Sequence, residues 1–172
     1  MPDNQSSVKC RLGARMTTDD TSYFTYNTPV GKVTICCQGD AIVRLVPGEA
    51  ALEGRHAPSA ILNAAATQLQ EYLAGKRRMF DLPLNPHGSV FQKDVLRAIE
   101  HIPYGETRTY SQVAAIIERP GAARAVGSAL GANPIPIIIP CHRVVPAGGG
   151  LGGYAYGPEM KRFLLHLEGV SI

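Results

Sequence analysis

A cysteine next to a histidine is the feature of this sequence best suited to covalent chemistry. A cysteine attacks as its thiolate, which forms near neutral pH only beside a base or a positive charge. His142 could supply the base for Cys141, and Arg143 adds positive charge directly after it. The ordinary alternatives are a small buried hydrophobe at Cys141, a structural histidine at His142 and a buried ion-pair partner at Arg143. The adjacent base and charge favour a nucleophilic thiol.

Two polar residues distant from the thiol in sequence suit supporting roles. Glu168 follows the segment 158–167, whose apolar spacing predicts a helix. A carboxylate at a helix C-terminus opposes the helix dipole, so we expect a compensating partner, and His142 would complete a Cys-His-Glu triad by role. Asn133 precedes the thiol segment and could be only a helix C-cap. The helix is expected to bury four apolar side chains, Met160, Phe163, Leu164 and Leu167.

The residues on either side of Cys141 indicate how the thiol would be held. Three isoleucines at 137–139 predict a buried strand or extended segment, which Pro140 ends. Downstream, residues 148–154 contain five glycines. They make a weak phosphate cradle because no Lys-Ser/Thr follows them, and they fit a mobile wall over a pocket better.

Two short helices are predicted before the thiol. Thr109 and Gln112 form a capping box that opens the first, and residues 122–132 form the second after a break at 119–121. This order is a helix-turn-helix pattern. The second helix consists almost wholly of small residues, so it either packs tightly against another helix or enters a nucleic-acid groove. Its only charged residue, Arg124, is either solvated or inserted into a base stack.

The placement of charge favours the nucleic-acid interpretation. Residues 119–158 contain no Asp or Glu, so an anionic partner would meet no local repulsion there. The whole chain is only mildly basic, with a net charge of +3. The basic run at 76–78 is interpreted as a solvated helix end, with phosphate contact as the alternative.

The N-terminal half has the pattern of a small sheet followed by a helix. Strands are predicted at 23–26, 33–36 and 41–45, and residues 47–58 are predicted to form a loop. Apolar residues at helical spacing predict a helix over 60–74, with Ser59 as its N-cap and Gly75 as its stop signal.

The pattern changes from strands to helices after a Pro- and Gly-containing stretch. Ser89 and Gln92 then form a capping box for a helix that ends by Pro103. We therefore predict an α/β (α+β) fold, with a small N-terminal antiparallel sheet and helix, then a mostly helical domain with the helix-turn-helix and the cysteine. The predicted divisions are a flexible tail at 1–20, an N-terminal domain at 21–82, a linker at 83–88 and a C-terminal domain at 89–172.

Composition excludes several classes of protein. A chain of 172 residues with 45% hydrophobic and 18% charged residues is globular rather than disordered. No pair among the four cysteines has C-x-x-C spacing, which excludes an ordinary zinc ribbon and a thioredoxin-type motif. The sequence shows neither a signal peptide nor an apolar run near the roughly 20 residues of a membrane helix. We expect a cytoplasmic protein with reduced thiols and no membrane partner.

The segment 140–144, with the sequence Pro-Cys-His-Arg-Val, strongly resembles the active-site motif of the O6-alkylguanine-DNA alkyltransferases. The resemblance extends over about residues 23–170 and is most specific in the C-terminal half. Further matching segments fall in the family's order and spacing, at 102–107, 110, 122–127, 133–134, 152–154 and 164–169.

The resemblance implies DNA repair by transfer of the alkyl group of O6-alkylguanine to Cys141, irreversibly and once per molecule. Such a protein is a methylated-DNA–protein-cysteine S-methyltransferase, and activity on O4-alkylthymine stays open. By analogy His142 acts as a base through a water, Glu168 orients His142, Tyr110 donates to the leaving guanine, and Asn133 orders the backbone around the thiol. The family uses no cofactor in this step, and no metal site is expected.

The resemblance also implies how DNA is bound. The small helix would enter the minor groove of double-stranded DNA, the damaged guanine would flip into a pocket, and Arg124 would fill the gap. The expected DNA contacts are Tyr110, Ala123, Arg124, Gly127 and Ser128. The expected pocket residues are Val144, Gly152, Tyr154, Ala155 and Tyr156. We expect a monomer, with cooperative binding on DNA as an open alternative.

Three positions depart from the usual family pattern. Leu96 replaces a common tryptophan, which is a packing change. Ala155 stands where serine or glycine is usual, and Tyr156 where glycine is usual, so we expect altered tolerance for bulky alkyl groups. The remaining cysteines do not match the four-cysteine metal site of fused bacterial relatives, and these are Cys10, Cys36 and Cys37.

Three other functions compete with alkyl transfer. A non-catalytic reader of alkylated DNA would lack the cysteine, which is present here as Cys141. A cysteine hydrolase would turn over and would not need the acid-free helix-turn-helix. A transcription factor would read the major groove with polar side chains, which the small-residue helix at 122–132 lacks.

Overall fold

The computed structural model describes residues 20–172, so the tail predicted at 1–20 lies almost wholly outside the described residues. The N-terminal half holds a sheet with strand order β3-β2-β1-β4. Its strands are β1 (Thr21–Thr28), β2 (Gly31–Gln38), β3 (Ala41–Pro47) and β4 (Arg55–His56). Neighbouring strands are antiparallel except β4, which pairs parallel to β1. The three predicted strands are confirmed, and β4 lies where only a loop was expected.

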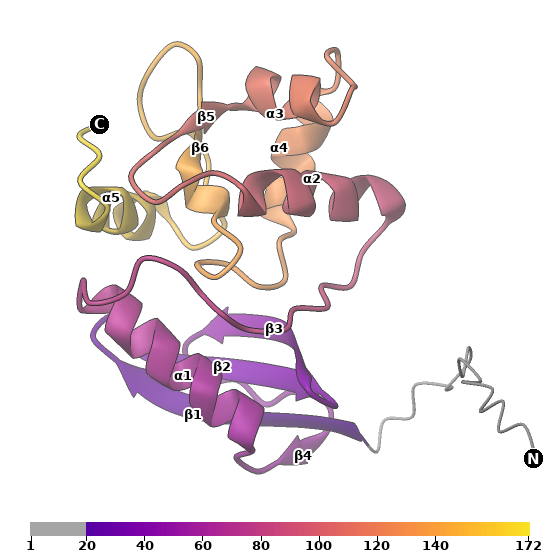
Figure 1. Cartoon of the computed structure of the whole chain (residues 1–172), viewed down its shortest axis with the longest axis vertical. Coiled ribbons are helices and arrows are strands. Elements are labelled where there is room, and N and C mark those ends of the chain that lie inside the picture. Colours follow the sequence, from indigo (N-terminus) through magenta and orange to yellow (C-terminus); the bar gives the residue numbers. More distant parts are fainter. Residues whose placement is uncertain (1–19) are drawn as a thin grey trace, which may run out of the picture.

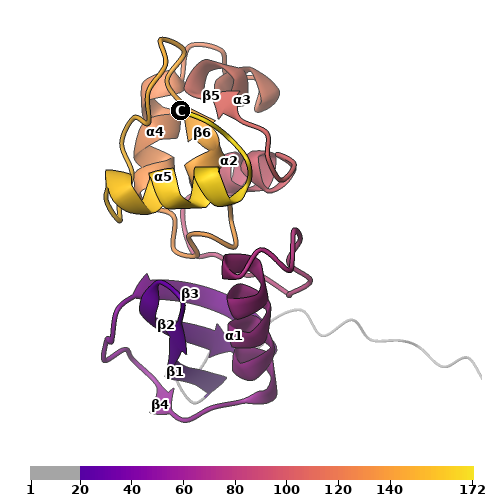
Figure 2. The ribbon, with the colours of Figure 1, turned by 90° about the vertical axis from the view of Figure 1, so that its left-hand side faces the viewer.

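Helix α1 (Ala60–Leu73) packs across one face of this sheet (Figures 1 and 2). Ser59 caps it as predicted, because its side chain accepts a hydrogen bond from the Leu62 backbone N–H. The helix buries one apolar stripe against the inward-facing residues of β2. A β-bulge shifts the pairing register with β3 between Cys36 and Cys37, and both residues are buried.

The C-terminal half is mostly helical and lies beyond the sheet (Figure 1). Its elements are α2 (Val90–Glu100), β5 (Arg108–Thr109), α3 (Tyr110–Ile116), α4 (Ala123–Gly131), the 3-10 helix η2 (Cys141–Arg143), β6 (Val144–Val145) and α5 (Pro158–Leu167). The two short strands β5 and β6 pair parallel to one another. The capping box of α3 is confirmed, with the Thr109 hydroxyl accepting from the Gln112 N–H and the Gln112 side chain accepting from the Thr109 N–H. The predicted α+β class is therefore confirmed.

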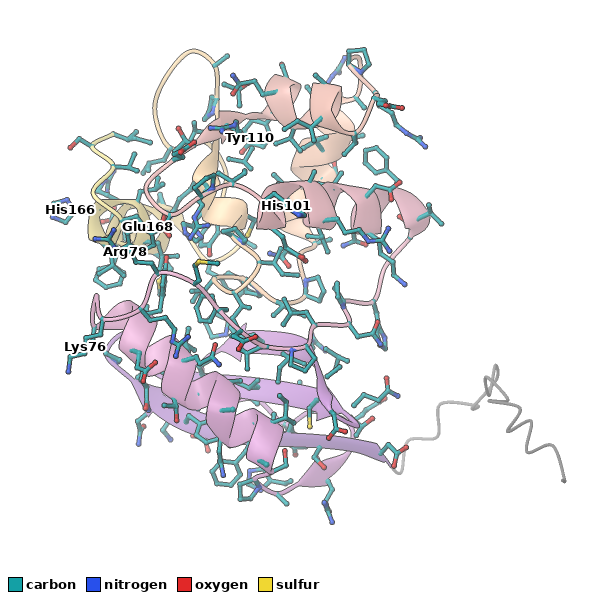
Figure 3. All side chains as sticks on the ribbon, viewed as in Figure 1. Lys76, Arg78, His101, Tyr110, His166 and Glu168 are labelled. Carbon is teal, nitrogen blue, oxygen red and sulfur yellow. The ribbon has the colours of Figure 1, made fainter. Side chains whose placement is uncertain are left out.

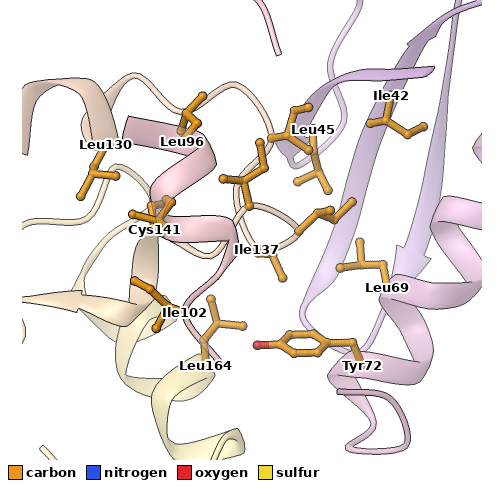
Figure 4. Packing of buried hydrophobic residues seen from close by; sticks show 14 of the residues in the cluster. Ile42, Leu45, Leu69, Tyr72, Leu96, Ile102, Leu130, Ile137, Cys141 and Leu164 are labelled. Atoms are coloured by element: carbon orange, nitrogen blue, oxygen red, sulfur yellow. The ribbon is translucent and has the colours of Figure 1, made fainter. Parts of the chain in front are cut away.

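The two halves are joined by main-chain hydrogen bonds and by one core. The Ile42 N–H donates to Pro83 at 2.8 Å, and Asn85 donates back to Ile42 at 2.9 Å, so the segment after α1 pairs with the sheet. The Leu45 N–H donates to Pro134 at 2.9 Å across the halves. A single cluster of buried apolar side chains runs from β2 and β3 through α1 to α2, η2 and α5 (Figure 4).

The capping box predicted for α2 forms only in part. Ser89 accepts a hydrogen bond from the Gln92 N–H, as an N-cap should. The Gln92 side chain does not return this bond but donates to the Ala132 carbonyl at 2.8 Å. The end of α4 leaves carbonyls without intrahelical partners, and Gln92 satisfies one of them.

The isoleucines at 137–139 form a tight turn, so the prediction of a strand or extended segment is wrong. Pro136 and Ile139 make an isolated bridge, and Ile137 has a φ of +73°. A β-branched residue rarely adopts this left-handed conformation. The Asn133 side chain holds the turn, donating to the Ile139 carbonyl at 2.9 Å and accepting from the Ile135 N–H at 3.0 Å. Burial of all three isoleucines is consistent with the apolar run.

Helix α5 has the predicted bounds, and of its four side chains expected to be buried, Leu164 is buried and Met160 and Leu167 are partly buried against the core, whereas Phe163 is not. Phe163 is 40% exposed, whereas Lys161 is completely buried with Leu164 and Leu165. The helix is rotated so that the aliphatic stem of the lysine, not the phenyl ring, faces the core. Among residues 20–172, no helix combines the length and apolar character needed to span a bilayer.

Candidate active site

Glu168 is the centre of a buried hydrogen-bond network that forms where α5 ends. Its Oε1 accepts from His142 Nε2 at 2.9 Å and from Arg143 Nη2 at 2.9 Å, and also from the Tyr72 hydroxyl. Its Oε2 accepts from Arg143 Nε at 3.0 Å and from the Gly105 N–H at 3.1 Å. Burial alone would raise the pKa of Glu168, but the hydrogen bonds from His142 and Arg143 outweigh it and hold this pKa at about 2. The group is therefore a carboxylate near neutral pH.

His142 is fully buried beside this carboxylate. Burial lowers the pKa of His142, although the hydrogen bond to Glu168 acts in the opposite direction. The imidazole is therefore neutral near pH 7, and a carboxylate on Nε2 fixes that nitrogen as the N–H donor. Its Nδ1 is buried with no hydrogen-bond partner in the described part of the chain, which leaves a free lone pair.

Arg143 forms the buried ion pair that the sequence left as an alternative. Its guanidinium contacts both oxygens of Glu168, and its Nη1 donates to the Ile102 carbonyl at 2.6 Å. A guanidinium that binds a carboxylate through two nitrogens fixes the orientation of that carboxylate. Arg143 thus positions Glu168, and Glu168 in turn positions His142.

The Cys141 thiol lies at the start of η2, directly after the turn that Asn133 holds. Cys141 is 7% exposed, and its backbone N–H donates to the Ile139 carbonyl at 2.8 Å. Burial raises the pKa of Cys141, while Asn133, Lys161 and Tyr154 oppose this effect. The resting group is therefore a thiol, and a base is required to form the thiolate.

A cavity of about 290 Å³, here called the Cys141 pocket, opens beside the thiol. Its lining residues are Tyr110, Gly127, Leu130, Gly131, Cys141, Gly153, Tyr154 and Ala155. The expected pocket residues Tyr154 and Ala155 are among them, but Val144, Gly152 and Tyr156 are not. A larger cavity of about 870 Å³ lies between α2 and the segment after α1, and Cys141 does not line it.

Tyr110 stands between the pocket and the glycine loop. A Cβ atom on Gly152 would lie 3.1 Å from the Tyr110 hydroxyl and 2.9 Å from the ring of Pro146. Gly152 also has a φ of +67°, so this position requires glycine on two counts. Burial raises the pKa of Tyr110, and a negative charge at Cys141 raises it further. The phenol therefore keeps its proton and can donate it.

Helix α4 packs on its neighbours along one side and leaves its other side exposed. Val126, Ala129 and Leu130 are buried, and the helix packs on α2 and α3. Its other side exposes Arg124 and Ser128, and Ala123 and Gly127 are partly exposed. Figure 3 shows Tyr110 at the start of α3, above Glu168 in this view. Four of the five expected DNA contacts thus lie on the side of α4 that the protein core does not use, whereas Tyr110 lies in α3. Tyr110 and Gly127 also line the Cys141 pocket.

Two buried polar residues were missed by the sequence analysis. Lys161 donates to the Val144 carbonyl at 2.7 Å and to Gly153 at 3.4 Å, and burial lowers its pKa to about 8. Lys161 lies three residues before Leu164, and residues at this spacing share one face of a helix, so the sequence could have indicated that Lys161 is buried. Tyr72 reaches Glu168 from α1, and no local signal links residues this far apart.

No group of three or more His, Cys, Asp or Glu side chains that could hold a metal ion occurs within residues 20–172. Cys36 and Cys37 are free and buried in the sheet, away from the Cys141 pocket. Cys10 lies outside the described residues.

Comparison with known proteins covers both halves of the chain. Residues 22–86 match the family model described as 6-O-methylguanine DNA methyltransferase, ribonuclease-like domain, and residues 90–170 match that of the DNA binding domain of the same name. A methylated-DNA–protein-cysteine methyltransferase of Methanosarcina acetivorans is 42% identical over 152 residues, covering 86% of this chain and 97% of the relative. The constitutive enzyme of that name in Bacillus subtilis is 42% identical over 158 residues, covering 87% and 96%.

The chain is also similar to solved structures of proteins of this kind. The chain is similar to the crystal structure of Mycobacterium tuberculosis OGT in complex with DNA, with a TM-score of 0.80 and 44% identity. That match covers 86% of this chain and 92% of the other. A crystal structure of Mycobacterium tuberculosis O6-methylguanine methyltransferase matches with a TM-score of 0.78 over the same shares.

Proposed function

The chain belongs to the 6-O-methylguanine DNA methyltransferase family, and from this membership we propose that it repairs DNA by moving the alkyl group of O6-alkylguanine onto its own Cys141. It is then a methylated-DNA–protein-cysteine S-methyltransferase that acts once. The observation that carries the proposal is a buried thiol that lines a pocket and is followed by a neutral imidazole fixed by a carboxylate. This is the arrangement that a thiol needs to become a nucleophile without a cofactor.

The reaction is a displacement at the alkyl carbon. The thiol of Cys141 gives its proton to His142, through one water, as the sulfur–carbon bond forms and the carbon–O6 bond breaks. Nδ1 is the ring nitrogen able to accept this proton, because Nε2 already donates to Glu168. The imidazolium that forms is stabilised by the buried carboxylate. The thioether on Cys141 is stable, so the protein is consumed.

The leaving guanine takes up negative charge as the bond to the alkyl carbon breaks. Tyr110 lines the pocket with a protonated phenol, so it can donate a hydrogen bond or a proton to the base. Asn133 supports the thiol indirectly, since it holds the turn before Cys141.

We propose that the exposed side of α4 binds the minor groove of double-stranded DNA. Ala123, Gly127 and Ser128 allow close approach, and Arg124 occupies the space of the flipped guanine. No acidic residue occurs from 119 to 158 to repel the phosphates. We propose that the protein transfers the alkyl group as a monomer.

The remaining features of the proposal concern organisation and selectivity. The N-terminal domain (21–82) and the linker (83–88) support a C-terminal domain (89–172) that binds DNA and accepts the alkyl group. Ala155 lines the pocket, and Tyr156 packs on Tyr154 with ring centroids 5.9 Å apart, so both positions bear on the size of the alkyl group accepted. A nucleophilic free thiol needs a reducing compartment, which supports a cytoplasmic location.

Intact-mass measurement on a duplex with one O6-methylguanine tests the proposal. We expect the wild type to gain one methyl group on the peptide that contains Cys141, at one-to-one stoichiometry. Cys141→Ala should gain none, whereas the matched control Cys36→Ala, which removes another buried thiol, should react as the wild type. Multiple turnover would instead indicate a hydrolase, and binding without mass gain a non-catalytic reader. Transfer by Cys141→Ala would overturn the assignment of the nucleophile.

A further inference from the structure

Tyr72 brings a hydroxyl from the N-terminal half into the site. The residue lies in α1 and is completely buried. Its hydroxyl donates to Glu168 Oε1 and lies 3.3 Å from His142 Nε2. Figure 4 shows the ring projecting from α1 with its hydroxyl directed toward Ile102 and Leu164 of the C-terminal half. The N-terminal half therefore reaches the group that orients His142.

Aromatic packing from both halves holds the ring in place. The Tyr72 ring packs on Phe80 with centroids 5.1 Å apart, and edge-on to Tyr104 at 6.1 Å. The Tyr104 hydroxyl donates to the Leu167 carbonyl at 2.8 Å, one residue before Glu168. The Tyr72 hydroxyl thus has little freedom to choose another acceptor.

We propose that Tyr72 is a positioning residue for alkyl transfer, holding Glu168 so that His142 keeps its Nδ1 lone pair free. This inference rests on the proposed function. Without the hydroxyl, Oε1 would keep donors from only two residues, His142 and Arg143. The carboxylate would be less well stabilised and would attract a proton onto the imidazole more strongly.

The charged and titratable groups around this imidazole are few. Arg143 faces it from η2, Lys161 and Glu168 from α5, and Tyr72 from α1. The two cations favour the neutral imidazole, and Glu168 favours the protonated one. Tyr72 weakens the effect of Glu168, because its hydrogen bond lowers the pKa of that carboxyl. Its removal should therefore raise the pKa of His142.

The test is the pH profile of single-turnover transfer for the wild type, Tyr72→Phe and Tyr104→Phe, from about pH 4.5 to about pH 9, because the pKa of His142 lies below its usual value. Both variants keep an aromatic ring and lose one hydroxyl, but Tyr104 donates to a backbone carbonyl and not to Glu168. We expect the rising limb of the Tyr72→Phe profile to move up by about one pH unit, since a tenfold change in acid strength is one unit. The loss approaches about tenfold only at pH values below both midpoints and is much smaller at pH 7, where the wild-type imidazole is already neutral. NMR titration of the His142 ring should move in the same direction.

The outcomes separate this inference from the proposed function. If the wild type transfers no alkyl group, the proposed function fails. If the wild type reacts and Tyr72→Phe shows an unchanged profile, the role of Tyr72 is refuted. An equal, pH-independent loss in Tyr72→Phe and Tyr104→Phe would show a packing role only, and would also refute it.

Discussion

Replacing Glu168 by glutamine tests whether the buried network is as strongly coupled as its contacts indicate. The substitution keeps the shape of the side chain but removes the charge. A glutamine amide offers one acceptor oxygen, whereas both oxygens of Glu168 now accept from Arg143, and Oε2 also accepts from Gly105. An N–H₂ group would face those donors, and the guanidinium would be buried without a counter-charge. Breaking a buried pair in this way costs about 3–5 kcal/mol.

The shifted pKa of Glu168 gives a second measure of how much this carboxylate contributes to the free energy of unfolding. The pKa of Glu168 falls from 4.5 to about 2 on folding, which corresponds to roughly 3 kcal/mol. Because the folded pKa is depressed, this stability is present above the unfolded value of 4.5 and is lost as pH falls toward about 2. Both magnitudes refer to the same network around Glu168.

Urea denaturation of wild type and Glu168→Gln at about pH 7, 5 and 3 measures these effects. We expect the variant to be less stable by about 3–5 kcal/mol at pH 7, and the difference to shrink by roughly 3 kcal/mol as the pH approaches 2. Glu49→Gln is the control, because Glu49 pairs with Lys32 on the surface. A difference between wild type and Glu168→Gln that stays constant with pH would refute the reasoning.

Three further predictions concern the pocket and the DNA surface. Gly152→Ala should slow transfer at least tenfold, because its Cβ would collide with Pro146 and displace the Tyr110 hydroxyl. Gly148→Ala is the control, because a Cβ there meets nothing within 4 Å and Gly148 does not line the Cys141 pocket, so it should react normally; equal rates in the two variants would contradict this. Tyr156→Gly should change the ratio of rates with O6-methylguanine and O6-benzylguanine, and an unchanged ratio would remove Tyr156 from the selectivity argument. Arg124→Ala should slow base flipping, because the space of the flipped guanine would stay unfilled, as measured by single-turnover rates with saturating DNA; an unchanged rate would refute this role of Arg124.

Most of the fold follows from local signals in the sequence. Ser59 and Thr109 mark helix starts because a side chain caps the backbone only two or three residues away. The first strands are short runs rich in β-branched and aromatic residues between turn residues, which is a local signal for a strand. Such signals need no knowledge of the tertiary structure, and the predicted class and element order were confirmed.

The features that were missed depend on contacts between distant segments. The Gln92 side chain does not complete the capping box, because it donates instead to the Ala132 carbonyl at the end of α4. The turn around Ile137 forms because Asn133 pins both of its ends, and three isoleucines alone favour a strand. Tyr72 and Glu168 are 96 positions apart, so only folding brings them together.

The core that crosses both halves has a consequence for exchange between relatives. The two halves match separate family models, which invites treating them as interchangeable modules. However, two hydrogen bonds cross the boundary. The Leu45 N–H donates to the Pro134 carbonyl, and the Tyr72 hydroxyl donates to the Glu168 carboxylate. A chimera that joins one half of this chain to the other half of a relative would fold and react well only if these meeting residues were transplanted together. Because the two halves share one core, a substitution at this boundary in one half restricts which residues the other half can have there.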